Sequence, residues 1–164
     1  MEKKYILSEQ VATMKLKRMA YEILENNPNE KELILAGIKD NGLIVASQIQ
    51  TILKEISPIS TKLISISFDK KLPSEITLSE PMDYNDKVII IIDDVANSGK
   101  ALLYALKPFL QFYPAKIQTA VLVERSHKTY PVHPDYVGVS LSTTLQEHIY
   151  VEVGDDCVKG AYLL

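Results

Sequence analysis

Residues 88–92, VIIII, form the longest purely aliphatic run in this 164-residue chain, and Asp93 and Asp94 follow it directly. The run is far too short to span a bilayer, which takes about 20 apolar residues. A short apolar run of this kind is typical of a strand that is covered on both faces. The sequence therefore predicts a buried strand that ends in two adjacent carboxylates.

Helical and strand-like patterns alternate around this run. Ser8, followed by Glu9 and Gln10, indicates the start of a helix that continues at helical spacing to about residue 26. We expect further strands at 33–38, 62–68, 88–92 and 116–124, and further helices at about 45–56 and 100–112. Strands that alternate with helices imply an α/β fold with a doubly wound, mainly parallel sheet.

Two segments break this rhythm. Residues 69–87 contain two prolines and no sustained period, so we expect a long mobile loop of the kind that often serves as a lid. Residues 125–153 hold short strand-like pieces between prolines and polar turns, and we expect them to form a small C-terminal hood over the sheet edge. The whole chain, residues 1–164, suits one domain.

Composition limits the class of protein. The chain is 46% hydrophobic and 24% charged, which is ordinary for a globular protein that needs no disulfide or metal to fold. Cys157 is the single cysteine, which fits a reducing compartment, and the first ten residues lack the apolar core of a signal peptide. We therefore expect a cytoplasmic protein with no membrane segment.

The residues after the two aspartates predict an anion site beside a hydroxyl site. Ligands of doubly wound sheets bind outside the carboxyl ends of the strands. The segment 97–101, NSGKA, leads into a helix whose first N–H groups suit a phosphate, and Gly99 permits a close approach of the backbone. Because Asp93 and Asp94 would repel that phosphate, they make sense as acceptors for hydroxyl groups or for the water shell of a metal. A sugar phosphate satisfies both halves.

Three other interpretations of the acidic pair are open. The pair can be no more than helix-start chemistry, although the Ser-Gly-Lys that follows argues against this. A Walker B strand also ends in acidic residues, but its partner loop needs Gly-Lys-Ser/Thr, and 37-GIKDNG-42 lacks it. A phospho-acceptor receiver domain would carry its acidic pair near the first strand.

The stretch IIIIDDVANSGKA resembles the phosphoribosyl diphosphate (PRPP) signature of type I phosphoribosyltransferases, with four hydrophobic residues, two acids and a small Ser-Gly loop. The segments YILSEQVATMKLKRMAYEILENN, LILAGIKDNG and VERSHKTYPVHPDYVGVSLSTT together resemble the PyrR-type family. Members of that family combine uracil phosphoribosyltransferase activity with regulation of pyrimidine gene expression by RNA binding. The resemblance covers nearly the whole chain in the right order.

The resemblance implies a set of binding roles. Asp93 and Asp94 would take the 2- and 3-hydroxyls of the PRPP ribose and would orient the water shell of a Mg²⁺ ion. The cradle for the 5-phosphate would be formed by Asn97, Ser98, Gly99, Lys100 and Ala101. The pyrophosphate loop would be formed by Lys39, Asp40, Asn41 and Gly42, with a non-proline cis peptide at Lys39–Asp40. Lys70 and Lys71 in the lid would neutralise pyrophosphate, and Tyr136, Val137 and Gly138 in the hood would lie near the base.

The implied reaction displaces pyrophosphate from C1 of the ribose. It builds positive charge on the sugar and negative charge on the leaving group, so the catalyst must stabilise pyrophosphate and exclude water. Mg²⁺, Lys39 and the lid lysines suit this role, and Asp93, Asp94 and Lys39 are the expected catalytic residues. Asn97 stands where hypoxanthine-guanine enzymes carry an Asp, and a neutral amide is a poor base, which favours uracil.

Two departures from the family pattern leave alternatives open. The pyrophosphate loop usually reads Lys-Thr-Arg-Gly, and Asn41 removes its arginine, while Ala101 removes a threonine hydroxyl from the phosphate cradle. A lost hydrogen bond to a charged group is worth about 1.5–3 kcal/mol. A sensor of PRPP or nucleotides with little transferase activity, or a purine phosphoribosyltransferase, is therefore an alternative.

The expected partners are PRPP, a nucleobase and further copies of the chain, as a homodimer or a higher homo-oligomer. The net charge is −3, with 18 basic against 21 acidic residues, and the basic residues include just two arginines, Arg18 and Arg125. Each phosphate contact needs a Lys or Arg, and Arg is the favoured bidentate donor. We therefore do not expect specific, high-affinity RNA binding.

Overall fold

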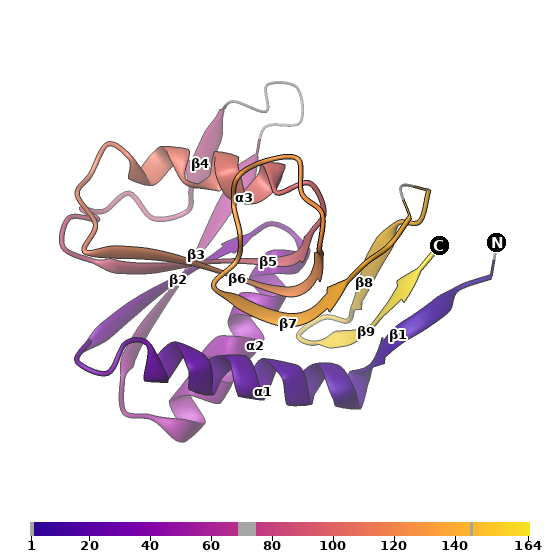
Figure 1. The fold of residues 1–164 in the computed structure, drawn as a ribbon. Coiled ribbons are helices and arrows are strands. Elements are labelled where there is room, and N and C mark those ends of the chain that lie inside the picture. Colours follow the sequence, from indigo (N-terminus) through magenta and orange to yellow (C-terminus); the bar gives the residue numbers. More distant parts are fainter. Residues whose placement is uncertain (1, 69–74, 145) are drawn as a thin grey trace.

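The computed structural model describes residues 2–68, 75–144 and 146–164, which form two sheets and their covering helices (Figure 1). The strands are β1 (Lys4–Ser8), β2 (Glu32–Ile38), β3 (Ser60–Phe68), β4 (Ile76–Leu78), β5 (Val88–Ala96), β6 (Lys116–Arg125), β7 (Tyr136–Leu141), β8 (Ile149–Val153) and β9 (Val158–Leu163). The helices are α1 (Glu9–Glu25), α2 (Asn41–Ile56), α3 (Lys100–Ala105) and the 3₁₀ helix η1 (Lys107–Phe109).

The main sheet has the strand order β4-β3-β2-β5-β6-β7, and every pair in it except β3–β4 is parallel. α1 and α2 cover one face, and α3 covers the other (Figure 1). Alternate residues of the aliphatic run serve the two faces: Ile90 and Ile92 pack on the side of α1 and α2, and Ile89 and Ile91 pack on the side of α3. The expected doubly wound, mainly parallel fold is confirmed, and it explains why the strand reads as a continuous apolar run.

The element boundaries follow local chemistry. The Ser8 side chain accepts a hydrogen bond from the Val11 N–H at 3.2 Å and so caps the start of α1, as expected. α3 is shorter than expected and gives way to η1, where Pro108 lacks the N–H that would continue an α-helix. β5 is longer than the aliphatic run, because pairing with β6 continues past Asp93 as far as Ala96. No helix in the described ranges is long and apolar enough to cross a membrane.

Residues 75–87, the described part of the expected lid, contain more structure than a loop. β4 pairs antiparallel with β3, and three residues are too few to show a period in the sequence. Tyr84 is 1% exposed, and its ring packs edge-on against Phe109 and Phe112 at centroid distances of 5.2 and 5.4 Å. Lys70 and Lys71, expected in the lid, lie outside the described residues.

The small sheet has the order β1-β9-β8 and draws on both ends of the chain (Figure 1). Its composition differs from the expected hood at 125–153, since β7 within that segment joins the main sheet parallel to β6. The buried alternate residues Tyr136 and Gly138 hold β7 in the main sheet, and this pattern is too short to distinguish the two sheets from sequence. The hood therefore consists of β8 together with the two terminal strands.

Tyr84 provides a test of this packing. We expect Tyr84→Ala to lower the free energy of unfolding by about 3–5 kcal/mol, because it leaves a cavity beside Phe109 of η1 and Phe112. Tyr84→Phe keeps the ring and loses only the 2.7 Å hydrogen bond from the hydroxyl to the Glu80 carbonyl oxygen, worth about 1 kcal/mol. Urea denaturation followed by circular dichroism measures both losses, and equal losses would contradict the packing role.

Candidate functional site

The carboxyl end of β5 meets the first turn of α2 at one edge of the main sheet. Gly42 makes this approach possible: a Cβ atom there would lie 2.8 Å from the Ile92 carbonyl oxygen and 2.9 Å from Asp93 Oδ1. Such distances are too short for any larger residue without a shift of the backbone. The expected pyrophosphate loop, residues 39–42, is thereby brought directly beside the acidic pair.

Asp93 is a buried carboxylate at the centre of this edge. It is 7% exposed, and its Oδ1 accepts the backbone N–H of Asp94 at 2.8 Å. Burial, and then the charge of Asp94, raise the pKa of the Asp93 carboxyl well above its usual range. The pair therefore presents acceptor oxygens that a cation or hydroxyl donors would stabilise.

Asn41 joins the pyrophosphate loop to Asp94 and to the small sheet. Its side-chain amide donates to Asp94 Oδ2 at 3.1 Å and to the Val151 carbonyl oxygen of β8 at 3.2 Å. Asp94 Oδ1 also accepts the Val95 N–H at 2.8 Å. Sequence reasoning treated Asn41 only as a missing arginine and did not find this link, because the partner strand lies more than 100 positions further along the chain.

The peptide bond between Lys39 and Asp40 is cis, as expected. It lies between β2 and α2, and the Lys39 N–H donates to the Ile66 carbonyl oxygen of β3 at 2.9 Å. Lys39 therefore stands at the carboxyl ends of two neighbouring strands, on the same edge of the sheet as Asp93.

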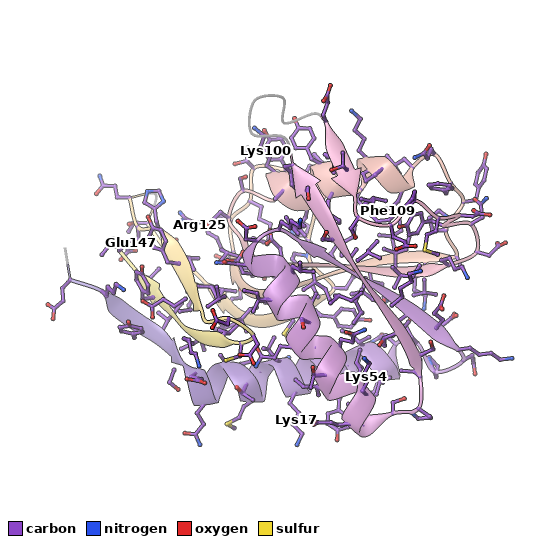
Figure 2. All side chains as sticks on the ribbon, turned by 180° about the vertical axis from the view of Figure 1, so that it is seen from behind. Lys17, Lys54, Lys100, Phe109, Arg125 and Glu147 are labelled. Carbon is purple, nitrogen blue, oxygen red and sulfur yellow. The ribbon has the colours of Figure 1, made fainter. Side chains whose placement is uncertain are left out.

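The segment 97–101 forms the other wall of the site. Gly99 has φ = 85°, a conformation that favours glycine, and the Ser98 hydroxyl accepts the Lys100 N–H at 3.3 Å. Lys100 stands at the start of α3 (Figure 2). A cavity of about 320 Å³ lies here and is lined by Phe68, Val95, Ala96, Asn97, Ser98, Gly99, Lys100, Ala101 and Tyr104. All five residues of the expected phosphate cradle thus face one cavity.

A second hollow of about 300 Å³ adjoins the cradle and is lined by Asn97, Ser98, Arg125, His127, Thr129 and His148. The last four were not among the expected site residues. Three of them could have been found from the sequence, because they lie at or just after the end of β6. A strand parallel to β5 ends at the same edge of the sheet as the aspartates. Arg125 lies between the main and small sheets, and its guanidinium donates to the Glu147 and Thr144 carbonyl oxygens at 2.6 and 3.1 Å (Figure 2).

The three residues expected near the base lie on β7 and line neither of the two hollows. Tyr136 is 2% exposed, and its hydroxyl donates to Gln118 Oε1 at 2.8 Å. The Val137 and Gly138 carbonyl oxygens accept hydrogen bonds from Arg18 of α1 at 3.0 and 2.7 Å. The structure therefore brings together the acidic pair, the expected pyrophosphate loop and the expected phosphate cradle. Residues 136–138 line neither hollow, although Val137 pairs with Val121, which in turn pairs with Asp93.

Known proteins are similar to this chain in sequence and in fold. The family model described as "Phosphoribosyl transferase domain" matches residues 4–156. A relative from Streptococcus uberis, named Bifunctional protein PyrR, is 35% identical over 168 residues, which is 97% of each chain. A protein of the same name from Streptococcus pneumoniae is 32% identical and covers 93% of this chain and 91% of its own length.

Solved structures give the same fold at lower identity. A hypoxanthine phosphoribosyltransferase from Trypanosoma cruzi has a TM-score of 0.79 at 15% identity, with 98% of this chain and 95% of that chain covered. A hypoxanthine-guanine phosphoribosyltransferase from Bacillus anthracis has a TM-score of 0.76 at 16% identity, with 99% of both chains covered. The family model and the two relatives span most of the chain, and it therefore belongs to the phosphoribosyl transferase domain family and, within it, to the PyrR proteins.

Proposed function

We propose that this protein transfers the phosphoribosyl group of PRPP to uracil, with release of pyrophosphate and with the help of Mg²⁺. One observation carries the proposal. The Asp93–Asp94 pair, of which Asp93 is buried, lies between two loops, 39–42 and 97–101, at a single edge of the sheet. PRPP carries ribose hydroxyls between a pyrophosphate and a 5-phosphate, so its three parts correspond to these three features.

The acidic pair would hold the ribose. Its carboxylates accept hydrogen bonds from the 2- and 3-hydroxyls, and bonds to a charged acceptor are stronger than neutral ones. The donor set also fits Mg²⁺, which prefers oxygen ligands and keeps several waters, so that two carboxylates beside substrate oxygens suit it. When bound, Mg²⁺ would supply charge neutralisation for the departing pyrophosphate. The raised pKa of Asp93 supports this assignment, since a cation here would offset the repulsion between the two carboxylates.

The two loops would hold the anionic groups. The 97–101 segment offers backbone N–H groups, the Ser98 hydroxyl and the Lys100 ammonium to the 5-phosphate. Lys39 and the backbone of the 39–42 loop would hold pyrophosphate, which accumulates negative charge as the bond to C1 breaks. The lid lysines, Lys70 and Lys71, remain proposed contributors to the same charge and to the exclusion of water.

The choice of uracil rests on the neutral Asn97 and on the names of the relatives. Asn97 lines both hollows, where it offers an amide rather than a carboxylate to the base. His127, Thr129 and His148 line the second hollow and can donate to carbonyl oxygens, of which uracil has two. We propose that these side chains contact the base. The solved neighbours named for hypoxanthine keep a purine as the alternative base.

A regulatory sensor with weak transferase activity is a second candidate function. It is favoured by Asn41, which stands where the family usually carries an arginine and whose amide is engaged with Asp94 and Val151. Lys39 is then the only cationic residue of the 39–42 loop. Such a protein would bind PRPP or a nucleotide but would turn over slowly.

The choice between these functions is testable with one set of assays. We expect pyrophosphate release from PRPP and Mg²⁺ in the presence of uracil, and at least about tenfold less with hypoxanthine, guanine or xanthine, because no carboxylate stands at position 97 to act on a purine proton. Removal of Mg²⁺ with a chelator should abolish release. Binding of PRPP without release from any base would instead identify the sensor, and faster turnover with a purine would overturn the choice of base.

The acidic pair is tested by Asp93→Asn with Asp94→Asn. Two charge-assisted hydrogen bonds are worth about 1.5–3 kcal/mol each, so PRPP affinity measured by calorimetry should fall at least about a hundredfold. A matched control is Glu25→Gln with Glu55→Gln, which removes the same charge from two exposed residues at the ends of α1 and α2. Unchanged affinity in the folded aspartate variant would disprove the assignment.

The single variant Asp93→Asn should become more stable while it binds PRPP less tightly. The folded-state pKa of Asp93 is raised, so the folded protein holds this proton more strongly than the unfolded chain does. Burial of Asp93 therefore costs the wild type no stability below the ordinary pKa of 3.8, where the carboxyl is protonated in both states. The free energy of unfolding falls as the pH rises above that value. Asn cannot ionise, so the gain in unfolding free energy should be present at pH 7 and should shrink as the pH falls toward 3.8. A loss of stability at pH 7 would contradict the account.

We expect no specific, high-affinity RNA binding. Both arginines are engaged within the chain, Arg18 with Glu22 and the Gly138 carbonyl oxygen and Arg125 with the Glu147 carbonyl oxygen. They are thus poorly placed to act as the favoured bidentate donors to phosphates. Filter binding to the leader of the cell's own pyrimidine genes at physiological salt tests this. Nanomolar binding that resists competitor RNA would show the expectation to be wrong.

A further inference from the structure

A buried ion pair lies beside the phosphate cradle and has no part in the proposed chemistry. Lys128 Nζ lies 2.6 Å from Glu124 Oε2, and the two side chains are only 3% and 16% exposed. The other ion pairs between described residues have both side chains at least one third exposed. A lysine at this depth is unusual, since charged groups are rarely buried unless they are paired.

Both partners of the pair are tied to the 97–101 segment. Glu124 lies on β6 opposite Ala96, the residue that precedes Asn97. Lys128 is followed by Thr129 and Tyr130, whose backbone N–H groups both donate to the Ser98 carbonyl oxygen, at 3.0 and 2.9 Å.

These contacts close a ring of interactions. The ring runs along the chain from Ala96 to Ser98 and crosses to residues 129 and 130 through their two hydrogen bonds. It then returns along the chain to Lys128 and passes through the ion pair to Glu124, which pairs with Ala96 in the sheet. Gly99 makes the contact close, because a Cβ atom there would lie 3.3 Å from the Tyr130 carbonyl oxygen. The orientation of the Ser98 peptide, and with it the direction of the cradle's N–H groups, therefore depends on where residues 128–130 are held.

Stability alone does not account for a pair of this kind. Buried ion pairs are often replaced by apolar residues of similar size with no loss of stability, because desolvation of the charges offsets their attraction. What two apolar side chains do not supply is a fixed direction between the atoms that they join.

We propose that Glu124 and Lys128 are positioning residues that hold the 97–101 segment in the conformation that binds the 5-phosphate of PRPP. The inference rests on the proposed function and deepens it. The pair contacts no reacting atom, and it acts through residues 129 and 130 on the Ser98 peptide.

The test replaces the pair by apolar residues and separates the two anion sites by the ligand used. Ribose 5-phosphate probes the 97–101 cradle, and inorganic pyrophosphate probes the 39–42 loop. For Glu124→Leu with Lys128→Met, calorimetry should give a Kd for ribose 5-phosphate that is raised about 10- to 100-fold, as a displacement of about 1 Å in a binding group can cause. The Kd for pyrophosphate and the melting temperature should stay close to the wild-type values.

Two further variants complete the experiment. Glu124→Lys with Lys128→Glu restores an ion pair with the charges exchanged and should recover most of the affinity for ribose 5-phosphate. Glu32→Leu with Lys87→Met removes an exposed pair, 3.4 Å apart, at the amino ends of β2 and β5, which is the end of the sheet away from the site. This variant should bind both ligands like the wild type.

The outcomes separate the inference from the function on which it rests. Tight binding of ribose 5-phosphate by the apolar variant would overturn the positioning role and leave the proposed function intact. An equal loss of both ligands with a lowered melting temperature would show a general structural role and would also overturn it. Absence of ribose 5-phosphate binding in the wild type would overturn the proposed function together with the inference. If the apolar variant does not fold, the test rests on Glu124→Lys with Lys128→Glu. Weak binding of ribose 5-phosphate by that variant, once it is shown to be folded, would overturn the proposal.

Discussion

The burial of Asp93 against the first turn of α2 is the constraint on which the rest of the site depends. An unpaired carboxylate in this position, with a second one beside it, is unfavourable for the folded protein, as the raised pKa of Asp93 indicates. It is tolerated because the aliphatic half of β5 is packed on both faces and because Gly42 leaves no atom where the carboxylate lies. A ligand that brings hydroxyls and a cation would offset the unfavourable charge of this buried carboxylate.

The other parts of the site are arranged around this pair by elements that also build the fold. α2 begins at Asn41, so residues at the start of the helix belong to the proposed pyrophosphate loop, and Asn41 links Asp94 to β8. The hydrogen bond from Asn41 to Val151 ties the hood to the carboxyl end of β5. Substitution of Asn41 by arginine would therefore remove this attachment of the small sheet as well as add a positive charge to the loop.

Much of this could be predicted from local sequence. The run 88–92, the Ser8 cap and the alternation of helices and strands follow from short-range patterns, and they led to the parallel sheet and to the position of the acidic pair. The residues that the sequence placed less well depend on partners distant in the chain. Tyr136 in a short strand could belong to either sheet, and the choice is made by its packing against α1 and its hydrogen bond to Gln118. The Glu124–Lys128 pair and the Asn41 link likewise become visible only when the partners are brought together.

The central claim is that Asp93 and Asp94 hold the ribose of PRPP, and carboxyl carbon NMR tests it most directly. In the free protein the Asp93 carboxyl should titrate well above the ordinary aspartate range. Addition of ribose 5-phosphate with Mg²⁺ should shift the carboxyl signals of both residues saturably and lower the apparent pKa of Asp93, because hydroxyl donors and a cation favour the ionised form. Carboxyl signals and a titration curve that are unchanged at saturating ligand would contradict the account.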